Sequence, residues 1–574
     1  MRDSRNARGN IARTWHTVAT AVGALVLAWT WWLAVKGGGW SFRVFDFRIS
    51  SRDPFRSLVV GGVLLAIGLS SVRLRADSVA IRRRCSMVAG ALSIATLILG
   101  IAYGSFVAGG ADAYGYVSQA ALWMNKSPFA PAALAVDGAW VDASWALTPL
   151  GYRPALTPGW MVPVYPPGLP IVMAAMRALA GEVGPYLVTP ILGALVCWLT
   201  YLFGKELYGP FEGALSAAIM LATPVFLLQL MTPMTDVPVT AWWLASAILA
   251  MTPARWSLGL SGLAAALAVM TRPNLVLLGV VLAALVIRTV RLNVLPLTRC
   301  LWWCVPAMFG PIAIAILNHT LYGSPIASGY GTLETLYSPK YAPVNISHYL
   351  KWLVTTQTVF PLVGLVASPW LIRSDRSRAW NVWWCCCFAV AVLVSYLWYL
   401  PFNDWTYLRF LLPAYPVMIT LSAAALVRAV VRTGLPEGLC VAVAVVIVCF
   451  GLWQARPAFK VAEFDDRYRA AAEFVRSLPP NTVVLANLHS GSIRYYANLV
   501  TARYEWIGGD QYIAALRWFQ QRAHPVYAVL DEAEVPEFRA KYSSSADVSW
   551  LDRPMTVIGK YGVRVYRVLP AVVH

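Results

Sequence analysis

Charged side chains are scarce in this chain of 574 residues. Asp, Glu, Lys and Arg together make up 13% of it, whereas hydrophobic residues make up 59%, and the mean hydropathy is +0.59. So little charge beside so much apolar surface is the composition of a membrane protein. The 26 tryptophans suit a protein with many membrane–water interfaces, where this side chain gathers.

Acidic residues are outnumbered by basic ones. The chain has 27 Asp and Glu against 46 Lys and Arg, which gives a net charge of +19. A nucleic-acid partner is not predicted, because much of the positive charge lies in short clusters between apolar runs. There it would set the orientation of membrane spans, since basic residues stay on the cytoplasmic side. The strongest cluster consists of Arg73, Arg75, Arg82, Arg83 and Arg84.

Features typical of several other protein classes are missing from the sequence. The nine cysteines all lie in or beside apolar runs, so a disulfide framework is not expected. The adjacent Cys385, Cys386 and Cys387 cannot all face one site on a helix, which favours small apolar side chains over metal ligands. No Gly-rich dinucleotide fingerprint is present, which argues against a nucleotide-sugar donor.

The apolar runs predict a polytopic α-helical membrane protein with about 13 spans. Several runs are short, near the lower limit for crossing a hydrocarbon core of about 30 Å. Two spans form an N-terminal extension, residues 1–85, and the others form a transmembrane domain, residues 86–454. The predicted spans are 17–35, 57–72, 86–108, 184–204, 211–230, 236–251, 257–271, 274–288, 300–317, 355–372, 382–400, 411–430 and 438–454.

Basic residues fix the predicted orientation in an inner or plasma membrane. The arginine-rich start of the chain is placed in the cytoplasm, and the arginine groups near 255, 288–299, 373–378 and 428–432 all fall on the inner side. The basic loop near residues 36–56 runs against this pattern. An odd number of spans then places the C-terminal region outside the cytoplasm.

The C-terminal region, residues 455–574, differs in composition from the rest of the chain. Charges become frequent and apolar runs shorten. Runs at 483–486 and 526–530 predict buried strands. Helical spacing occurs at 462–477, 491–499 and 510–522. We therefore predict an extracytoplasmic α/β domain.

The segment 109–183 is expected to be a long outer loop that carries the active region. It contains Asp112, and because a carboxylate is costly inside a bilayer, this residue should lie where a helix leaves the membrane. A loop of this length is usually functional or disordered. Its many Trp, Tyr and Pro residues argue against disorder.

A series of short motifs lies at the predicted outer membrane boundaries. Together they resemble the GT-C glycosyltransferases, in particular the branch containing the protein O-mannosyltransferases and the aminoarabinose transferase of lipid A. The motifs are Asp112…Tyr116…Ala120, Tyr165-Pro166-Pro167-Gly168-Leu169-Pro170, Met234-Thr235-Asp236-Val237-Pro238, Thr271-Arg272-Pro273, Asn318…Tyr322-Gly323-Ser324-Pro325 and Leu408-Arg409-Phe410-Leu411-Leu412-Pro413.

The resemblance implies an inverting transfer of a sugar from a polyprenyl-phosphate carrier to a lipid, glycan or protein acceptor outside the cytoplasm. The sequence departs from the family pattern at two positions. Many members have a second acidic residue where this chain has Ala113, which weakens the case for a bound metal, so no metal is assigned. Many have Lys where this chain has Tyr165, which leaves the carrier phosphate in need of another cation.

An inverting transfer needs a base for the acceptor's proton and a group that stabilises the departing phosphate. Asp112 is the predicted base; the alternative is a solvated carboxylate at a helix end that only sets topology. Asp236 lies in a very short outer turn. It either caps the following helix, as Asp before Pro often does, or orients the acceptor or Asp112.

The carrier phosphate needs arginine or lysine partners. Arg409, Arg153 and Arg272 are the predicted partners, because all three fall on the outer side. Arg409 could instead extend to the lipid interface. The residues predicted to shape the sugar or acceptor pocket are Tyr116, Tyr165 and Tyr330, of which the last two are equally suited to anchoring at the membrane interface.

Two further questions stay open at the level of sequence. His489-Ser490 follows a predicted strand and precedes a helix, where the helix N-terminus could hold an anion or Ser490 could be an ordinary N-cap. The whole chain could also be a transporter or flippase of lipid-linked sugars, or a non-catalytic assembly protein. The absence of a convincing internal repeat and the gathering of ionisable residues at span ends favour the transferase over the transporter.

Overall fold

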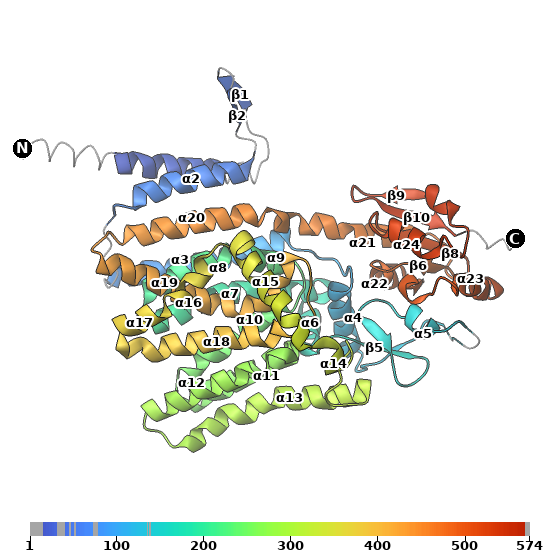
Figure 1. Ribbon diagram of the computed structural model, residues 1–574, viewed down its shortest axis with the longest axis horizontal. Helices are drawn as coiled ribbons and strands as arrows, with labels where there is room; N and C mark the ends of the chain where they lie inside the picture. The colour runs from blue at the N-terminus through green and yellow to red at the C-terminus, as the bar shows by residue number, and fades with distance from the viewer. Residues whose placement is uncertain are drawn as a thin grey trace, which may run out of the picture.

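The computed structural model describes residues 15–30, 32, 41–44, 47–50, 53–72, 79–134, 136 and 139–568. The predicted cytoplasmic start of the chain lies outside these residues. The described chain is mostly helical. Its helices run along the long axis of the molecule, and its C-terminal residues form a small separate body at one end (Figure 1).

The central helices are buried on most sides, whereas the outer ones expose apolar side chains. The central helices include α7 (Gly184–Leu207), α10 (Asp236–Ala250) and α19 (Tyr415–Arg432). On the outer helix α13 (Leu301–Tyr322), Val305 is 69% exposed and Ile316 64% exposed. Long helices that expose such side chains fit lipid and not water. The chain is therefore a multi-pass membrane protein.

The other main helices of the bundle largely follow the predicted spans. α20 has the same bounds as the predicted span 438–454, and most of the others differ from their predicted spans by up to seven residues at their ends. α15 is an exception, because it lies between the predicted spans 300–317 and 355–372, where no span was predicted. These helices are α2 (Pro54–Leu69), α3 (Val79–Tyr103), α8 (Pro210–Leu221), α11 (Arg255–Thr271), α12 (Leu278–Leu292), α15 (Ala342–Trp352), α18 (Ala379–Leu397) and α20 (Gly438–Gln454).

The predicted number of spans exceeds the number of long apolar helices. Among the described residues, five helices are long and apolar enough to cross a membrane, or up to seven if each of two bent pairs counts as one span. Shorter apolar helices at Trp15–Thr30, Pro54–Leu69 and Asp236–Ala250 account for part of the difference. A helix of 16 residues covers only about 24 Å. The count of 13 therefore stays a prediction.

Two of the predicted spans are interrupted in the structure. The predicted span 211–230 consists of α8 and α9 (Pro224–Leu230), which meet at 64°. The predicted span 355–372 is likewise divided into α16 (Phe360–Val366) and α17 (Ser368–Ser374). Pro224 and Pro369 stand at the start of the second helix in each pair. Proline is tolerated there but prevents the preceding helix from running on.

The segment expected to be an outer loop is more regular than predicted. It contains α4 (Asp112–Met124), α6 (Gly168–Ala180) and a small antiparallel sheet. The strands of this sheet, in the order β3-β5-β4, are β3 (Ala130–Pro131), β5 (Trp160–Pro163) and β4 (Tyr152–Pro154). At Gly168 a Cβ would lie 2.4 Å from the backbone nitrogen of Thr271. This close approach seats the start of α6 on the end of α11.

Residues 461–568, called here the C-terminal domain, contain a five-stranded sheet of order β7-β6-β8-β10-β9. β6 is parallel to β7 and β8, whereas β10 is antiparallel to β8 and β9. The two predicted strands correspond to β6 and β8. The elements are α21 (Val461–Val475), β6 (Val483–Leu485), β7 (Val500–Ala502), α23 (Tyr512–Gln521), β8 (Val526–Leu530), α24 (Glu534–Tyr542), β9 (Thr556–Ile558) and β10 (Val563–Arg567).

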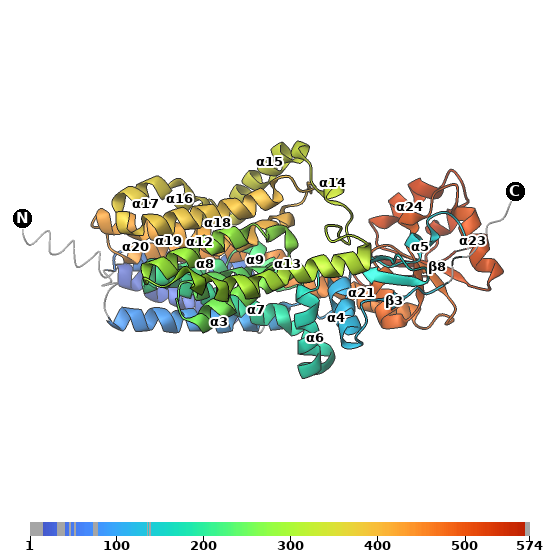
Figure 2. The ribbon, with the colours of Figure 1, turned by 90° about the horizontal axis from the view of Figure 1, so that it is seen from below.

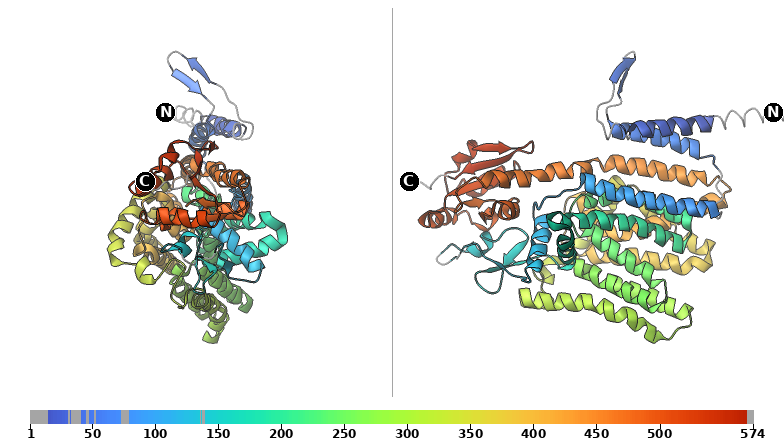
Figure 3. Two further views of the ribbon diagram at one scale, coloured as in Figure 1. Left: turned by 90° about the vertical axis from the view of Figure 1, so that its right-hand side faces the viewer. Right: turned by 180° about the vertical axis from the view of Figure 1, so that it is seen from behind.

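Hydrogen bonds join the C-terminal domain to the segment just before α4. The Arg469 guanidinium donates to the Phe106 carbonyl at 2.6 Å, and the Tyr496 hydroxyl accepts from the Ala108 N–H at 2.8 Å. Figures 2 and 3 show the C-terminal domain against the segment around α4 and α5 (Ala143–Ala146). The position at which α4 begins therefore depends on residues far along the chain.

Candidate active site

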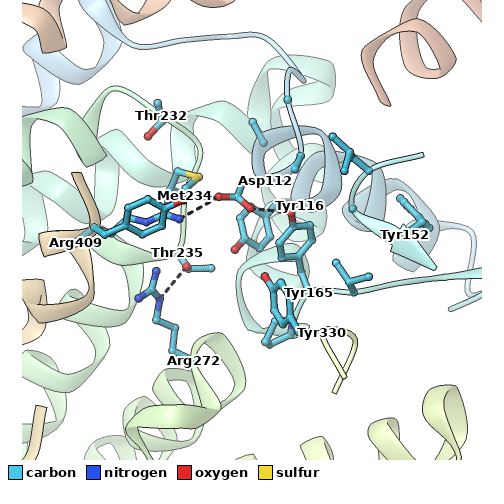
Figure 4. A pocket seen from close by; sticks show the side chains of 18 of the residues that line it. Asp112, Tyr116, Tyr152, Tyr165, Thr232, Met234, Thr235, Arg272, Tyr330 and Arg409 are labelled. Atoms are coloured by element: carbon cyan, nitrogen blue, oxygen red, sulfur yellow. Dashed lines mark hydrogen bonds and ion pairs between the residues drawn. The ribbon is translucent and has the colours of Figure 1, made fainter. Parts of the chain in front are cut away.

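A cavity of about 640 Å³ lies where the ends of the membrane helices meet the outer segment and the C-terminal domain. Its volume falls within the range of about 300–1,000 Å³ that is common for ligand sites. Six of the residues predicted from the sequence line it: Asp112, Tyr116, Tyr165, Arg272, Tyr330 and Arg409. Figure 4 shows these side chains converging from separate parts of the chain.

Asp112 is held at the first position of α4 with part of its carboxylate open to the cavity. Its Oδ1 accepts a hydrogen bond from the Tyr165 hydroxyl at 2.7 Å, and its Oδ2 accepts from both terminal nitrogens of Arg409 at 3.3 and 3.4 Å. The positive end of the α4 dipole also lies beside this carboxylate. The side chain is 32% exposed, so a ligand in the cavity could reach it.

Tyr165 occupies the position where many members of the resembled family have lysine, and it acts as a neutral donor to Asp112. Its ring lies so close to α4 that a Cβ at Gly115 would be 2.1 Å from a ring carbon. The rings of Tyr116 and Tyr330 lie 4.5 and 5.8 Å from it, centre to centre. Close packing on three sides fixes the direction of the hydroxyl.

Each of the three guanidinium nitrogens of Arg272 donates a hydrogen bond to the protein. Its Nε donates to the Thr235 hydroxyl at 3.1 Å, and its terminal nitrogens donate to the Tyr396 hydroxyl at 3.1 Å and to Asp236 at 2.7 Å. Asp236 itself is completely buried behind Arg272, at the start of α10 and outside the cavity lining. Asp236 therefore contacts the cavity lining through Arg272.

Arg409 differs from Arg272 in its Nε, which has no partner in the part of the chain that the structure describes, whereas the Nε of Arg272 donates to Thr235. Arg409 lies in a 3-10 helix, Trp405–Ala414, with its guanidinium 5.0 Å from the ring centre of Tyr407 and 5.6 Å from that of Phe410. Its Nε is buried and has no hydrogen-bond partner among the described residues. The side chain points toward Asp112 (Figure 4) and not toward the outer surface. An oxygen of a bound anion would satisfy this donor.

Arg153 lies outside the cavity lining. It is on β4, where its guanidinium is 5.4 Å from the ring centre of Trp145 and 5.6 Å from that of Tyr322. One terminal nitrogen also donates to the Ser328 carbonyl at 3.4 Å. The structure thus does not bring this predicted phosphate partner to the other two arginines.

The sequence did not reveal that the C-terminal domain closes one side of the cavity. Four of its residues line the cavity: Asp465, Tyr468, Arg503 and Trp506. Arg503 and Trp506 directly follow β7, and ligands in open α/β sheets commonly bind beyond the carboxyl ends of parallel strands. That position could have pointed to them. The N-cap prediction for Ser490 is wrong: His489 precedes the short helix α22 (Ser490–Ser492), and the Ser490 hydroxyl instead accepts from the Leu150 N–H.

Across the described part of the chain, no three His, Cys, Asp or Glu side chains are grouped as metal ligands. The polar groups of the cavity are two carboxylates, three guanidinium groups and several hydroxyls. Such a set binds anions and hydroxyl groups.

Comparisons with known proteins agree with this geometry. Residues 164–313 match the model of the dolichyl-phosphate-mannose-protein mannosyltransferase family. The structure of ArnT from Cupriavidus metallidurans bound to undecaprenyl phosphate is similar, with 14% identity, a TM-score of 0.50, and coverage of 84% of this chain and 97% of that one. No curated protein sequence matches the chain.

The archaeal oligosaccharyltransferase AglB from Archaeoglobus fulgidus, in complex with an inhibitory peptide and a dolichol-phosphate, is also similar. It has 13% identity, a TM-score of 0.52, and coverage of 81% of this chain and 71% of that one. The chain has the fold of the GT-C enzymes, as the sequence resemblance predicted. The comparisons give no support to a transporter.

Proposed function

We propose that this protein transfers a sugar, with inversion, from a polyprenyl-phosphate carrier to a lipid, glycan or protein acceptor outside the cytoplasm. The observation that carries the proposal is the pairing in one cavity of Asp112, an accessible carboxylate, with Arg409, an arginine whose Nε lacks a partner among the described residues. The two similar structures were solved with undecaprenyl phosphate and a dolichol-phosphate, which supports a lipid-phosphate donor.

In the proposed reaction, Asp112 takes the proton of the acceptor's nucleophilic group. The acceptor atom attacks the anomeric carbon from the face opposite the carrier. The bond between that carbon and the phosphate oxygen breaks, and its electron pair leaves with polyprenyl phosphate. Arg409 holds the phosphate and stabilises the charge that grows on it.

Asp236 and Arg272 act differently from Asp112 and Arg409 in this scheme. Because all three guanidinium nitrogens of Arg272 already donate to protein groups, we assign Arg272 a fixed positive charge at the cavity and not the main role in binding the phosphate. Asp236 is a positioning residue that holds Arg272. Tyr116, Tyr165 and Tyr330 form an aromatic wall for the transferred sugar.

One experiment tests the proposed function directly. Surface glycans, lipids and proteins of the source cell are compared by mass spectrometry with and without the gene, and after complementation with the wild-type or Asp112→Asn protein. We expect one sugar modification to disappear with the gene and to return only with the wild-type protein. Full return with Asp112→Asn, or no change in any sugar after gene removal, would contradict the proposal.

The glycine at position 115 provides a further prediction. The added methyl group of Gly115→Ala must displace the Tyr165 ring, and with it the hydroxyl that orients Asp112. We expect turnover to fall about 10- to 100-fold, because small displacements of catalytic groups have effects of this size. The matched control is Gly279→Ala on α12, where a Cβ meets open space. Equal turnover in both variants would show that Tyr165 does not position the carboxylate.

We propose that the chain crosses an inner or plasma membrane about 13 times. The N-terminus then lies in the cytoplasm, and residues 455–574 lie outside the cytoplasm. A reporter that is active only outside the cytoplasm is fused after Pro457, and a second fusion after Arg376 serves as the inside control. We expect activity only from the first fusion, because arginine-rich turns stay inside. The reverse pattern would show that one of the short apolar helices does not cross.

A further inference from the structure

The wall that the C-terminal domain adds to the cavity carries polar donors without partners. Arg503 and Trp506 both line the cavity. The Arg503 side chain is only 9% exposed. Its Nε and the indole Nε1 of Trp506 are buried and have no hydrogen-bond partner among the described residues. Buried N–H groups without partners are costly, so such groups indicate a place for a ligand that accepts hydrogen bonds.

The backbone holds these two side chains in place. The Arg503 N–H donates to the Ala146 carbonyl at 2.6 Å, immediately after β7, and the Trp506 N–H donates to the Arg503 carbonyl at 3.2 Å. The Trp506 ring stacks on Trp145 of the outer segment, with 4.8 Å between the ring centres and 23° between the planes. The Arg503 guanidinium lies 5.9 Å from the centre of the Trp506 ring. The two donors and the aromatic stack therefore form one built surface.

The charge of Arg503 is only partly compensated. One terminal nitrogen pairs with Glu505, but this carboxylate is at the solvent-exposed surface and also accepts from Asn487 at 3.0 Å. Burial lowers the pKa of the Arg503 guanidinium to about 10, and the nearby Tyr165 opposes this only in part. A buried cation in such surroundings gains from an anion placed against its free edge.

We propose that Arg503 and Trp506 bind an anionic group, phosphate or carboxylate, on the sugar of the acceptor. The acceptor sugar lies against the Trp145–Trp506 stack, and Asp465 on the same wall accepts its hydroxyl hydrogens. This inference rests on the proposed function, in which the carrier phosphate is held by Arg409 at a different wall. Binding by Arg503 and Trp506 makes the transferase selective for acceptors with acidic sugars over those with neutral sugars.

The test measures binding separately from transfer. Full-length protein in detergent is saturated with undecaprenyl phosphate, which fills the donor site, and is then titrated calorimetrically with glucose 6-phosphate, glucuronate, inorganic phosphate and neutral glucose. We expect both acidic sugars to bind at least about tenfold more tightly than glucose, because hydrogen bonds to charged groups are strong. Inorganic phosphate should bind more weakly than glucose 6-phosphate, since it cannot use the aromatic stack.

Three variants locate the binding surface. Arg503→Gln should abolish the preference for acidic sugars without changing the affinity for undecaprenyl phosphate. Trp506→Phe keeps an aromatic ring but removes the N–H. It should weaken the binding of acidic sugars by about threefold or more, as expected for the loss of one hydrogen bond. Arg539→Gln is the matched control, because this guanidinium is exposed in the same domain and pairs with Asp552; it should bind as the wild type does.

The outcomes separate this inference from the proposed function. Equal affinity for glucose and the acidic sugars would overturn the anionic subsite, and so would an Arg503→Gln variant that loses undecaprenyl phosphate and not the acidic sugars. If no variant binds undecaprenyl phosphate, the proposed function fails. The anionic subsite can then be tested separately: Arg409→Gln, which lacks the proposed donor-site arginine, is titrated with the same sugars, and its preference for acidic sugars still measures binding by Arg503. If Arg503→Gln does not fold, Trp506→Phe decides the question.

Discussion

Asp112→Asn is expected to lower turnover by roughly 10²- to 10⁴-fold, the size of effect that loss of a general base produces. Asparagine keeps the shape of the side chain and accepts the Tyr165 hydrogen bond, so the protein should still fold and insert. It cannot take a proton from the acceptor. Turnover is measured on detergent-purified protein with the carrier-linked sugar found by the glycan comparison.

The outer segment offers a matched control for this variant. Asp142 is exposed in the same segment and has a left-handed backbone conformation, with φ of 60°, which asparagine also adopts readily. Asp142→Asn should therefore behave like the wild type. Turnover of Asp112→Asn within about twofold of Asp142→Asn would remove Asp112 from the chemical step, because no base contributes so little.

Arg409→Ala is expected to lose about 10²- to 10³-fold in turnover and to bind the donor more weakly, as happens when a donor to developing charge is removed. Lysine keeps the charge but lacks the planar fork of the guanidinium. Arg409→Lys should therefore retain part of the activity. Steady-state kinetics at matched protein levels separate the two effects, with donor affinity read from undecaprenyl phosphate binding.

Arg153→Ala is the control for Arg409, because Arg153 lies outside the cavity between Trp145 and Tyr322. It should leave donor affinity unchanged. If Arg409→Ala kept wild-type kinetics, the carrier phosphate would have to be bound by another guanidinium of the cavity, Arg272 or Arg503. A loss of expression in Arg409→Ala, with normal kinetics of the remaining protein, would show that Arg409 only stabilises the fold.

Local patterns in the sequence predicted most helices, because a membrane helix and a buried strand each have a composition and a period of their own. The span at 438–454 and the strand at 526–530 have the predicted bounds. The breaks before Pro224 and Pro369 were missed, because hydrophobicity carries no information about the backbone hydrogen bond that a proline removes. The helices α4 and α6 were missed because glycine, proline and aromatic residues obscured their period.

Part of the site could also be predicted from the sequence, but for a different reason. Each motif at an outer boundary could be recognised separately, and six of the eight predicted residues line one cavity. Local sequence could not show that Asp236 is buried behind Arg272, or that Arg153 turns toward Trp145. Nor could it show the wall formed by Arg503 and Trp506. These facts depend on tertiary contacts between separate segments, such as those that join Asp236 to Arg272 and Arg503 to Ala146.

The attachment of the C-terminal domain to the start of α4 has a consequence for how the enzyme is made. Ala108 bonds to Tyr496, 388 positions later, and Asp112 bonds to Arg409, 297 positions later. During synthesis, the carboxylate thus leaves the ribosome long before its surroundings exist. The cavity closes only when the C-terminal domain has been made and has folded against it. A partly made chain therefore lacks one wall of the cavity, and the site becomes complete only at the final step of the protein's assembly.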